Sequence, residues 1–230
     1  MARRYFIETF GCQMNFHDSE RMAGLLEQDG YEPATAPDDA DLVVVNTCSV
    51  RERAEEKLYS RLGELRQLNA SGESGPTIAV AGCVAQQEGS RILARAPFVD
   101  VVVGTQNASL LPVLVERSEA SPEPVVNIDP HEDVSFPLGV ARRADRVKAY
   151  VNIIEGCNDF CAFCVVPYTR GHERMRPVGE ILDEVRQAAD AGHREVHLLG
   201  QIVNHYQAPD VPSCDFAELL ARVNGIPGIQ

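Results

Sequence analysis

Short apolar runs alternate with amphipathic helical patterns along this chain of 230 residues. Four of the apolar runs in the first half are expected to be strands, at residues 4–10, 41–47, 77–82 and 99–104. Segments with apolar residues at helical spacing separate them, at residues 19–30, 50–68 and 91–96. Buried strands that alternate with helices are typical of a parallel sheet with helices on its faces. The sequence therefore predicts an α/β fold with a Rossmann-like or flavodoxin-like N-terminal sheet.

The same alternation resumes in the last third of the chain. Strands are expected at residues 147–155 and 195–201, and helices at 178–192 and 215–225. Between the two parts, residues 118–146 are rich in proline and have no sustained period, which is typical of a linker. We predict an N-terminal domain at 1–117, a linker at 118–146 and a second domain at 147–230.

Three cysteines follow predicted strands of the first domain. Cys12, Cys48 and Cys83 end the short stretches "FGC", "NTC" and "AGC". Loops that leave the carboxyl ends of parallel strands share one edge of the sheet, where ligands usually bind. A free cysteine also packs well as a small apolar residue, which is the simpler interpretation of each one taken alone. Three at equivalent strand ends favour a shared metal or cluster.

Another three cysteines crowd into "EGCNDFCAFC", at Cys157, Cys161 and Cys164. Structural zinc is held by four protein ligands, commonly as two C-x2-C pairs, whereas this spacing is C-x3-C-x2-C with three ligands. Thiolates also hold iron–sulfur clusters, and three thiolates leave one iron of a four-iron cluster open. The triplet therefore favours a cluster with a position for a small molecule.

The composition of the chain limits the compartment and the binding partners that we expect. We find no apolar run of membrane-spanning length and no signal peptide, so we expect a cytoplasmic protein whose cysteines stay reduced. The net charge of −13 argues against a generic nucleic-acid binder, although residues 142–176 hold 7 Lys and Arg against 4 Asp and Glu. The seventh cysteine, Cys214, is interpreted as incidental.

The triplet, with the aromatic Phe163 before its last cysteine, resembles the hallmark of the radical S-adenosylmethionine superfamily. Together with "NTCSVRERAEEK", "AGCVAQQEG" and "LLGQIVN", it makes the whole chain resemble the methylthiotransferases of that superfamily. The stretch "CVVPYTRGHERMRP" looks most like the MiaB group, which modifies tRNA.

This resemblance implies a cofactor set and a reaction. The triplet would hold a 4Fe-4S cluster that binds S-adenosylmethionine, and Cys12, Cys48 and Cys83 would hold a second 4Fe-4S cluster that supplies or carries sulfur. The substrate would be N6-isopentenyladenosine beside the tRNA anticodon, converted to its 2-methylthio derivative. A flavodoxin or ferredoxin would donate electrons, no membrane would be involved, and a monomer is expected.

Weaker candidates accompany the cysteines. Phe163 is interpreted as a contact for the cofactor adenine or as a core residue, and Gln201 and Asn204 as further cofactor contacts at a strand end. Ile202 stands between them where the family pattern usually has Asn. The remaining candidates are basic side chains, interpreted either as ligands for phosphate or carboxylate or as a solvated loop: Arg170, Arg174 and Arg176. The histidines His172, His193, His197 and His205 are not favoured as metal ligands.

The family also implies a longer protein than this chain. Its members continue through a partial TIM barrel and a basic RNA-binding domain called TRAM, whereas this sequence holds only the first βα units of the barrel. We therefore expect a fragment that binds clusters better than it turns over. Two alternatives stay open: a methylthiotransferase for a ribosomal-protein aspartate, and a non-enzymatic iron–sulfur or zinc module.

Overall fold

The computed structural model describes residues 2–50, 52–69, 75–130 and 139–230. The chain divides into two compact units, unit 1 at Met1–Phe136 and unit 2 at Pro137–Gln230. Each unit has its own sheet and its own buried core. The boundary between the units falls inside the segment that the sequence predicted as a linker.

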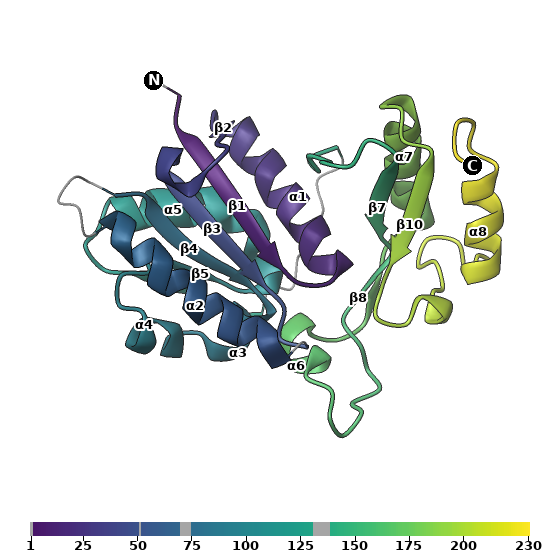
Figure 1. The fold of residues 1–230 in the computed structure, drawn as a ribbon. Coiled ribbons are helices and arrows are strands. Elements are labelled where there is room, and N and C mark those ends of the chain that lie inside the picture. The colour runs from purple at the N-terminus through teal and green to yellow at the C-terminus, as the bar shows by residue number, and fades with distance from the viewer. Residues whose placement is uncertain (1, 51, 70–74, 131–138) are drawn as a thin grey trace. The chain divides into compact units, whose positions relative to one another are not determined.

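Unit 1 is built on a sheet in which all neighbouring strands are parallel (Figure 1). Its six strands are β1 (Arg4–Phe10), β2 (Glu32–Pro33), β3 (Leu42–Thr47), β4 (Thr77–Gly82), β5 (Val101–Val103) and β6 (Val125–Asn127). Their order is β2-β1-β3-β4-β5-β6, which begins with the flavodoxin-like order and has its switch point between β1 and β3. The predicted α/β class is confirmed.

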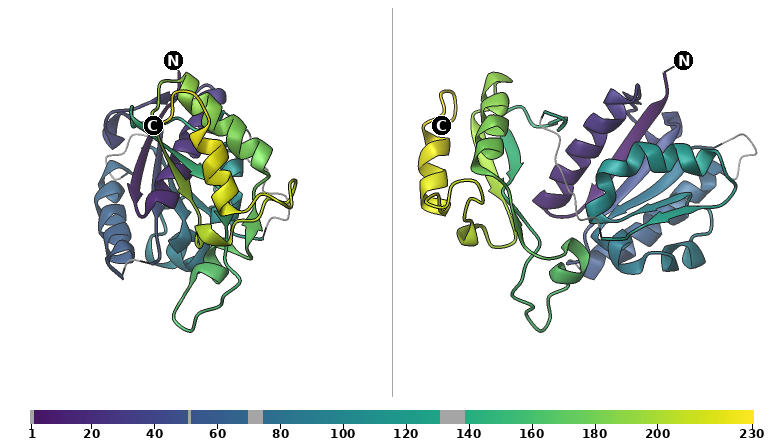
Figure 2. Two further views of the ribbon diagram at one scale, coloured as in Figure 1. Left: turned by 90° about the vertical axis from the view of Figure 1, so that its right-hand side faces the viewer. Right: turned by 180° about the vertical axis from the view of Figure 1, so that it is seen from behind.

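Helices cover both faces of this sheet, as Figures 1 and 2 show. Helices α1 (Gln13–Gln28) and α5 (Leu111–Glu119) lie on one face, and α2 (Glu52–Asn69), α3 (Cys83–Glu88) and α4 (Arg91–Arg95) lie on the other. Short 3-10 helices are found at Pro37–Asp39 (η1) and Thr105–Leu110 (η2). Because side chains alternate along a strand, Val44 packs in the core under α1, and Val43 and Val45 pack in the core under α2. Burial on both faces explains why these strands read as continuous apolar runs.

The predicted linker begins too early. Helix α5 continues to Glu119, and Val125–Asn127 forms β6, which pairs with β5 at the edge of the sheet. The prolines at 122 and 124 come just before this edge strand, where the missing N–H donor is tolerated. A strand of three residues is also too short to show a period. The rest of the predicted linker includes residues 131–138, which lie outside the described residues.

Unit 2 contains a parallel pair, β7 (Lys148–Asn152) and β10 (Glu195–Leu199), and two helices, α7 (Val178–Asp190) and α8 (Phe216–Asn224). Residues of both strands and both helices share one apolar core. A short antiparallel ribbon pairs β8 (Ile154–Glu155) with β9 (Arg174–Met175), and the shorter helices are α6 (Val166–Arg170) and η3 (Val203–His205). The strand–helix order agrees with two successive βα units. No helix in the described stretches of either unit is both long enough and apolar enough to cross a membrane.

Candidate metal centres

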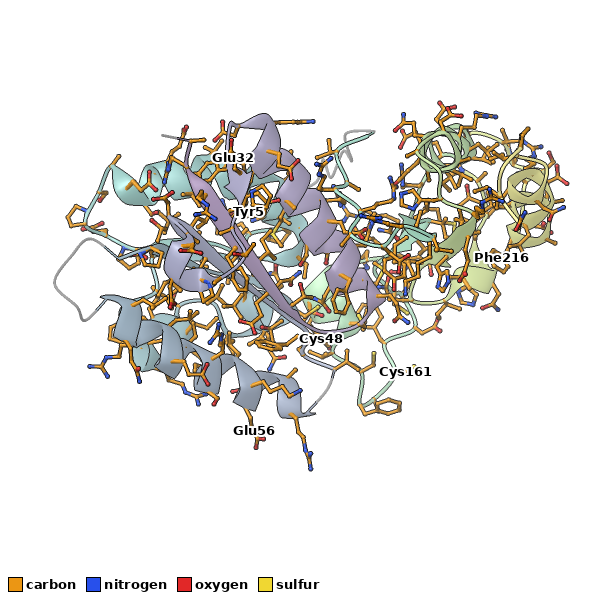
Figure 3. The ribbon with its side chains drawn as sticks, turned by 45° about the horizontal axis from the view of Figure 1, so that its top comes forward. Tyr5, Glu32, Cys48, Glu56, Cys161 and Phe216 are labelled. Carbon is orange, nitrogen blue, oxygen red and sulfur yellow. The ribbon has the colours of Figure 1, made fainter. Side chains whose placement is uncertain are left out.

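The cysteines of unit 1 lie at the ends of three adjacent strands. Cys12 is the N-cap of α1 after β1, Cys48 follows β3 directly, and Cys83 follows β4 directly as the first residue of α3. The last residues of these strands are in register, since Phe10 pairs with Thr47 and Thr47 pairs with Gly82. All three loops therefore leave the sheet from one row, on both sides of the switch point (Figure 3 labels Cys48 there).

The Cys48 thiol contacts the other two thiols. Side-chain hydrogen bonds join Cys48 to Cys12 and to Cys83, and together with burial they raise the pKa of the Cys48 thiol. Cys48 and Cys83 are buried, whereas Cys12 is half-buried. The backbone N–H of Val50 donates to Cys48 Sγ at 3.3 Å. The structure thus brings together the three side chains that the sequence placed at one sheet edge.

Sequence reasoning missed two buried asparagines beside this trio. Asn15 accepts a hydrogen bond from the Cys12 thiol at 3.3 Å, and Asn46 hydrogen-bonds to Asn15. Both are fully buried. The signal was present in "DLVVVNTC", where Asn46 interrupts an otherwise apolar strand just before a cysteine.

The cysteine triplet of unit 2 lies in the loop that joins β8 to β9 (Figure 3 labels Cys161). Gly156 enters this loop with φ +78°, and a Cβ there would lie 2.1 Å from the carbonyl oxygen of His172. Cys157 N–H donates to Gly171 O at 3.2 Å, and Cys164 N–H donates to Cys161 O at 2.9 Å. The first bond joins the two ends of the loop, and the second forms a tight turn between Cys161 and Cys164.

Exposure differs within the triplet. Cys157 is buried, Cys161 is exposed and Cys164 is half-buried. Over the described residues of both units, no three His, Cys, Asp or Glu side chains are arranged as the ligands of a single metal ion.

A buried carboxylate anchors the base of the triplet loop. Glu155 pairs with Arg170 at 3.6 Å and with Arg174 at 3.3 Å. Arg176, also buried, pairs with Glu184 at 2.6 Å and donates to Asn152 O at 3.0 Å. The solvated-loop interpretation of Arg170 and Arg176 is wrong, because both guanidinium groups are buried in ion pairs within the protein.

The three weaker cofactor candidates, Phe163, Gln201 and Asn204, differ in their surroundings. Phe163 is 96% exposed, which excludes a core role. Gln201 lies just beyond β10, and its Oε1 is buried with no hydrogen-bond partner among the described residues. Asn204 is exposed in η3. Within the described chain, no hydrogen bond or ring contact links these three side chains.

The histidines and the seventh cysteine have local structural contacts. His172 stacks edge-on against Phe160, and His193 is buried, which lowers its pKa. His197 pairs with Glu195, and His205 Nδ1 lies 3.5 Å from Glu173. The remaining thiol, that of Cys214, is part of the unit 2 core.

Two family models match the chain, one over each trio. The model described as uncharacterized protein family UPF0004 covers residues 4–104, and the Radical SAM superfamily model covers residues 151–222. The tRNA-2-methylthio-N(6)-dimethylallyladenosine synthases of Vibrio campbellii and Koribacter versatilis are 46% identical to the chain, and that of Methylibium petroleiphilum is 48% identical. Each match covers at least 99% of the chain.

Over its whole length the chain is similar to radical S-adenosylmethionine methylthiotransferases. The chain spans about half the length of the curated relatives it matches, namely 49%, 51% and 50% of the three named above. Both cysteine trios fall inside the matched spans, so the resemblance read from the motifs is confirmed.

Proposed function

We propose that this chain holds two 4Fe-4S clusters, one on each cysteine trio. With them it converts N6-isopentenyladenosine beside a tRNA anticodon into the 2-methylthio derivative. The observation that carries the proposal is the contact of Cys48 with both Cys12 and Cys83 at three neighbouring strand ends. The names of the relatives support the substrate.

The donor set of unit 1 supports a cluster over a single ion. It consists of thiols, which are the ligands of iron–sulfur clusters. A cluster gives each thiolate its own iron, so the ligands of a cluster need not converge on one metal. Burial and the neighbouring thiols disfavour the thiolate form of Cys48. Cysteine binds metal as the thiolate, so bound iron would stabilise the deprotonated form.

The triplet loop supports the second cluster and S-adenosylmethionine. Cys157, Cys161 and Cys164 would hold this cluster, which would supply the electron for reductive cleavage of S-adenosylmethionine. The chain itself contributes positioning: Glu155 ties the loop base, and Phe163 presents an exposed ring for the cofactor adenine. Gln201 offers a buried acceptor that lacks a donor within the described residues, and the cofactor has N–H and O–H groups to fill it.

Three further features belong to this proposal. A cluster held by the triplet would need a one-electron donor such as flavodoxin or ferredoxin. The reaction takes place in the cytoplasm, where thiols stay reduced. Asn204, exposed beyond β10, contacts the cofactor or the RNA.

Anaerobic reconstitution tests the proposal. The wild type is expected to bind about eight iron atoms per chain, four in each cluster. C157A/C161A/C164A and C12A/C48A/C83A are each expected to lose half of this iron. Formation of 5'-deoxyadenosine should disappear only in the first variant. Iron without any cleavage of S-adenosylmethionine would instead indicate a non-enzymatic module, and product formation on a ribosomal-protein aspartate rather than on tRNA would overturn the substrate.

A further inference from the structure

Asn46 is a polar side chain inside the apolar core of unit 1. It is the penultimate residue of β3 and is fully buried. Its Nδ2 donates to Asn15 O and to Ser19 Oγ, both at 2.8 Å, and its Oδ1 accepts from Asn15 Nδ2 at 3.3 Å. A buried amide is costly unless its polar atoms are paired, and here all of them are. The amide of Asn46 therefore has one orientation, and it is directed at α1.

The partner Asn15 connects this amide to the first cysteine. It lies in the first turn of α1 and is fully buried. Asn15 bonds to Asn46 through both its backbone oxygen and its side chain, and its Oδ1 accepts from the Cys12 thiol. Asn46 is therefore linked through Asn15 to the Cys12 thiol.

The other side of Asn46 packs against the residue before Cys83. Gly82 has φ +91°, and a Cβ there would lie 2.2 Å from Asn46 Oδ1 and 2.7 Å from the backbone oxygen of Thr47. The amide thus occupies the space that only glycine leaves, beside the end of β4. Cys48 lies two residues after Asn46 on the same strand. One side chain is linked to the immediate surroundings of all three cysteines.

We infer that Asn46 is a positioning residue for the thiol trio of unit 1. It fixes the three loop starts relative to one another, so that Cys12 and Cys83 meet Cys48. This inference rests on the proposed function where it concerns iron, because the trio is the proposed cluster site. Groups that orient metal ligands typically affect metal affinity by 10- to 100-fold.

The test uses the full chain carrying C157A/C161A/C164A, which keeps only the unit 1 trio and the lone Cys214. Asn46→Ala is compared with Asn107→Ala in this background. Asn107 is an equally buried asparagine of unit 1 whose amide donates to Asn127 Oδ1 and to Asp129 O, so it controls for the loss of a buried amide. Ser19→Ala removes one partner of Asn46 and covers the case in which Asn46→Ala does not fold.

Two readouts separate this inference from the proposed function. The first is the affinity of the metal-free protein for phenylarsine oxide, which bridges neighbouring thiols. The second is the rate at which reconstituted iron is lost to a chelator. Circular dichroism on heating checks that each variant is folded.

Asn46→Ala is expected to lower the affinity for phenylarsine oxide and to raise the rate of iron loss to the chelator, each by about 10-fold. Ser19→Ala should give a smaller change in the same direction, and Asn107→Ala should match the parent. Equal behaviour of Asn46→Ala and the parent, or equal weakening by Asn107→Ala, would overturn the inference. A parent that binds the arsenical but no iron would contradict the proposed cluster, while the arsenical comparison would still decide the role of Asn46.

Discussion

Unit 1 takes its cysteines from three strand ends spread over residues 12–83, whereas unit 2 takes all three from residues 157–164 of one loop. The first trio is mostly buried, and its Cys48 thiol contacts the other two. The second trio runs from buried Cys157 to exposed Cys161. The position of the first trio thus depends on strand register across the sheet, whereas that of the second depends on a glycine turn and a few ion pairs at the base of one loop. Changes in the loop should therefore damage the second site and leave the first intact.

Gly156→Ala is expected to produce the largest difference between the two sites, because it should damage the unit 2 loop and spare unit 1. The added Cβ would meet two backbone carbonyls, His172 O at 2.1 Å and Gly171 O at 2.5 Å, at a φ of +78°. We expect the closed loop to be destabilised by about 4 kcal/mol, and reconstituted iron to fall to the share of unit 1. Hydrogen exchange of residues 157–173 and iron analysis measure both effects.

The control for this change is Gly192→Ala. Gly192 also has a positive φ, but nothing lies within 4 Å of the added Cβ, so only backbone strain of about 1 kcal/mol is expected. If Gly156→Ala kept full iron and normal exchange, the loop would not depend on this turn.

The next effect concerns the buried carboxylate at the base of the loop. Glu155→Gln removes the negative partner of buried Arg170 and of Arg174. Breaking a buried ion pair from one side costs about 3 kcal/mol, and that loss should appear in unit 2 alone. Urea unfolding followed by hydrogen exchange of peptides from each unit measures it.

Glu218→Gln is the matched variant, because Glu218 pairs with Arg222 on the exposed surface of α8. Its cost should stay below about 0.5 kcal/mol. Equal losses from Glu155→Gln and Glu218→Gln would show that the pairs at the loop base contribute no more than a surface pair.

High pH should lower the free energy of unfolding of unit 1. Burial raises the pKa of Tyr31 to about 12 from an ordinary value of 10.0. Below pH 10 the folded and unfolded states both keep the phenol proton. As pH rises from about 10 to about 12 the unfolded state loses it first, so the free energy of unfolding falls by about 2 kcal/mol. Urea unfolding across this range, compared with Tyr31→Phe, measures the loss.

Tyr31→Phe should remove this dependence at little cost near neutral pH, because the Tyr31 hydroxyl is buried with no hydrogen-bond partner among the described residues. Tyr206 in unit 2 provides the contrast, since its hydroxyl donates to Arg176 O at 2.8 Å. Tyr206→Phe should cost about 1 kcal/mol at neutral pH. An alkaline loss that persisted in Tyr31→Phe would point to another group.

The smallest stability effect is expected at Phe163. Its ring is 96% exposed, so Phe163→Ala should change the free energy of unfolding by less than about 0.5 kcal/mol. If the ring contacts the cofactor adenine, the Kd of S-adenosylmethionine should rise several-fold in the reconstituted protein. Calorimetric titration measures this change, and an unchanged Kd would remove Phe163 from the cofactor site.

The sequence predicted the meeting of Cys12, Cys48 and Cys83 because parallel strands end at a common edge, a rule that needs no side-chain detail. It did not predict β6, since three residues carry no period. It also misjudged Arg170, because a basic residue looks the same in sequence whether it is solvated or paired with a buried carboxylate. Asn46 was visible as a polar break in an apolar strand, but its partners on α1 and β4 follow only from the fold.

The register that aligns Phe10, Thr47 and Gly82 has a consequence for the order of biogenesis. The three thiols of unit 1 cannot meet until the first 83 residues have been made and β1, β3 and β4 have paired, a long-range event with a high entropic barrier. The eight residues of the triplet need only a short segment to emerge. The two cysteine sets thus form at different times during synthesis, and the second depends on a much shorter segment than the first.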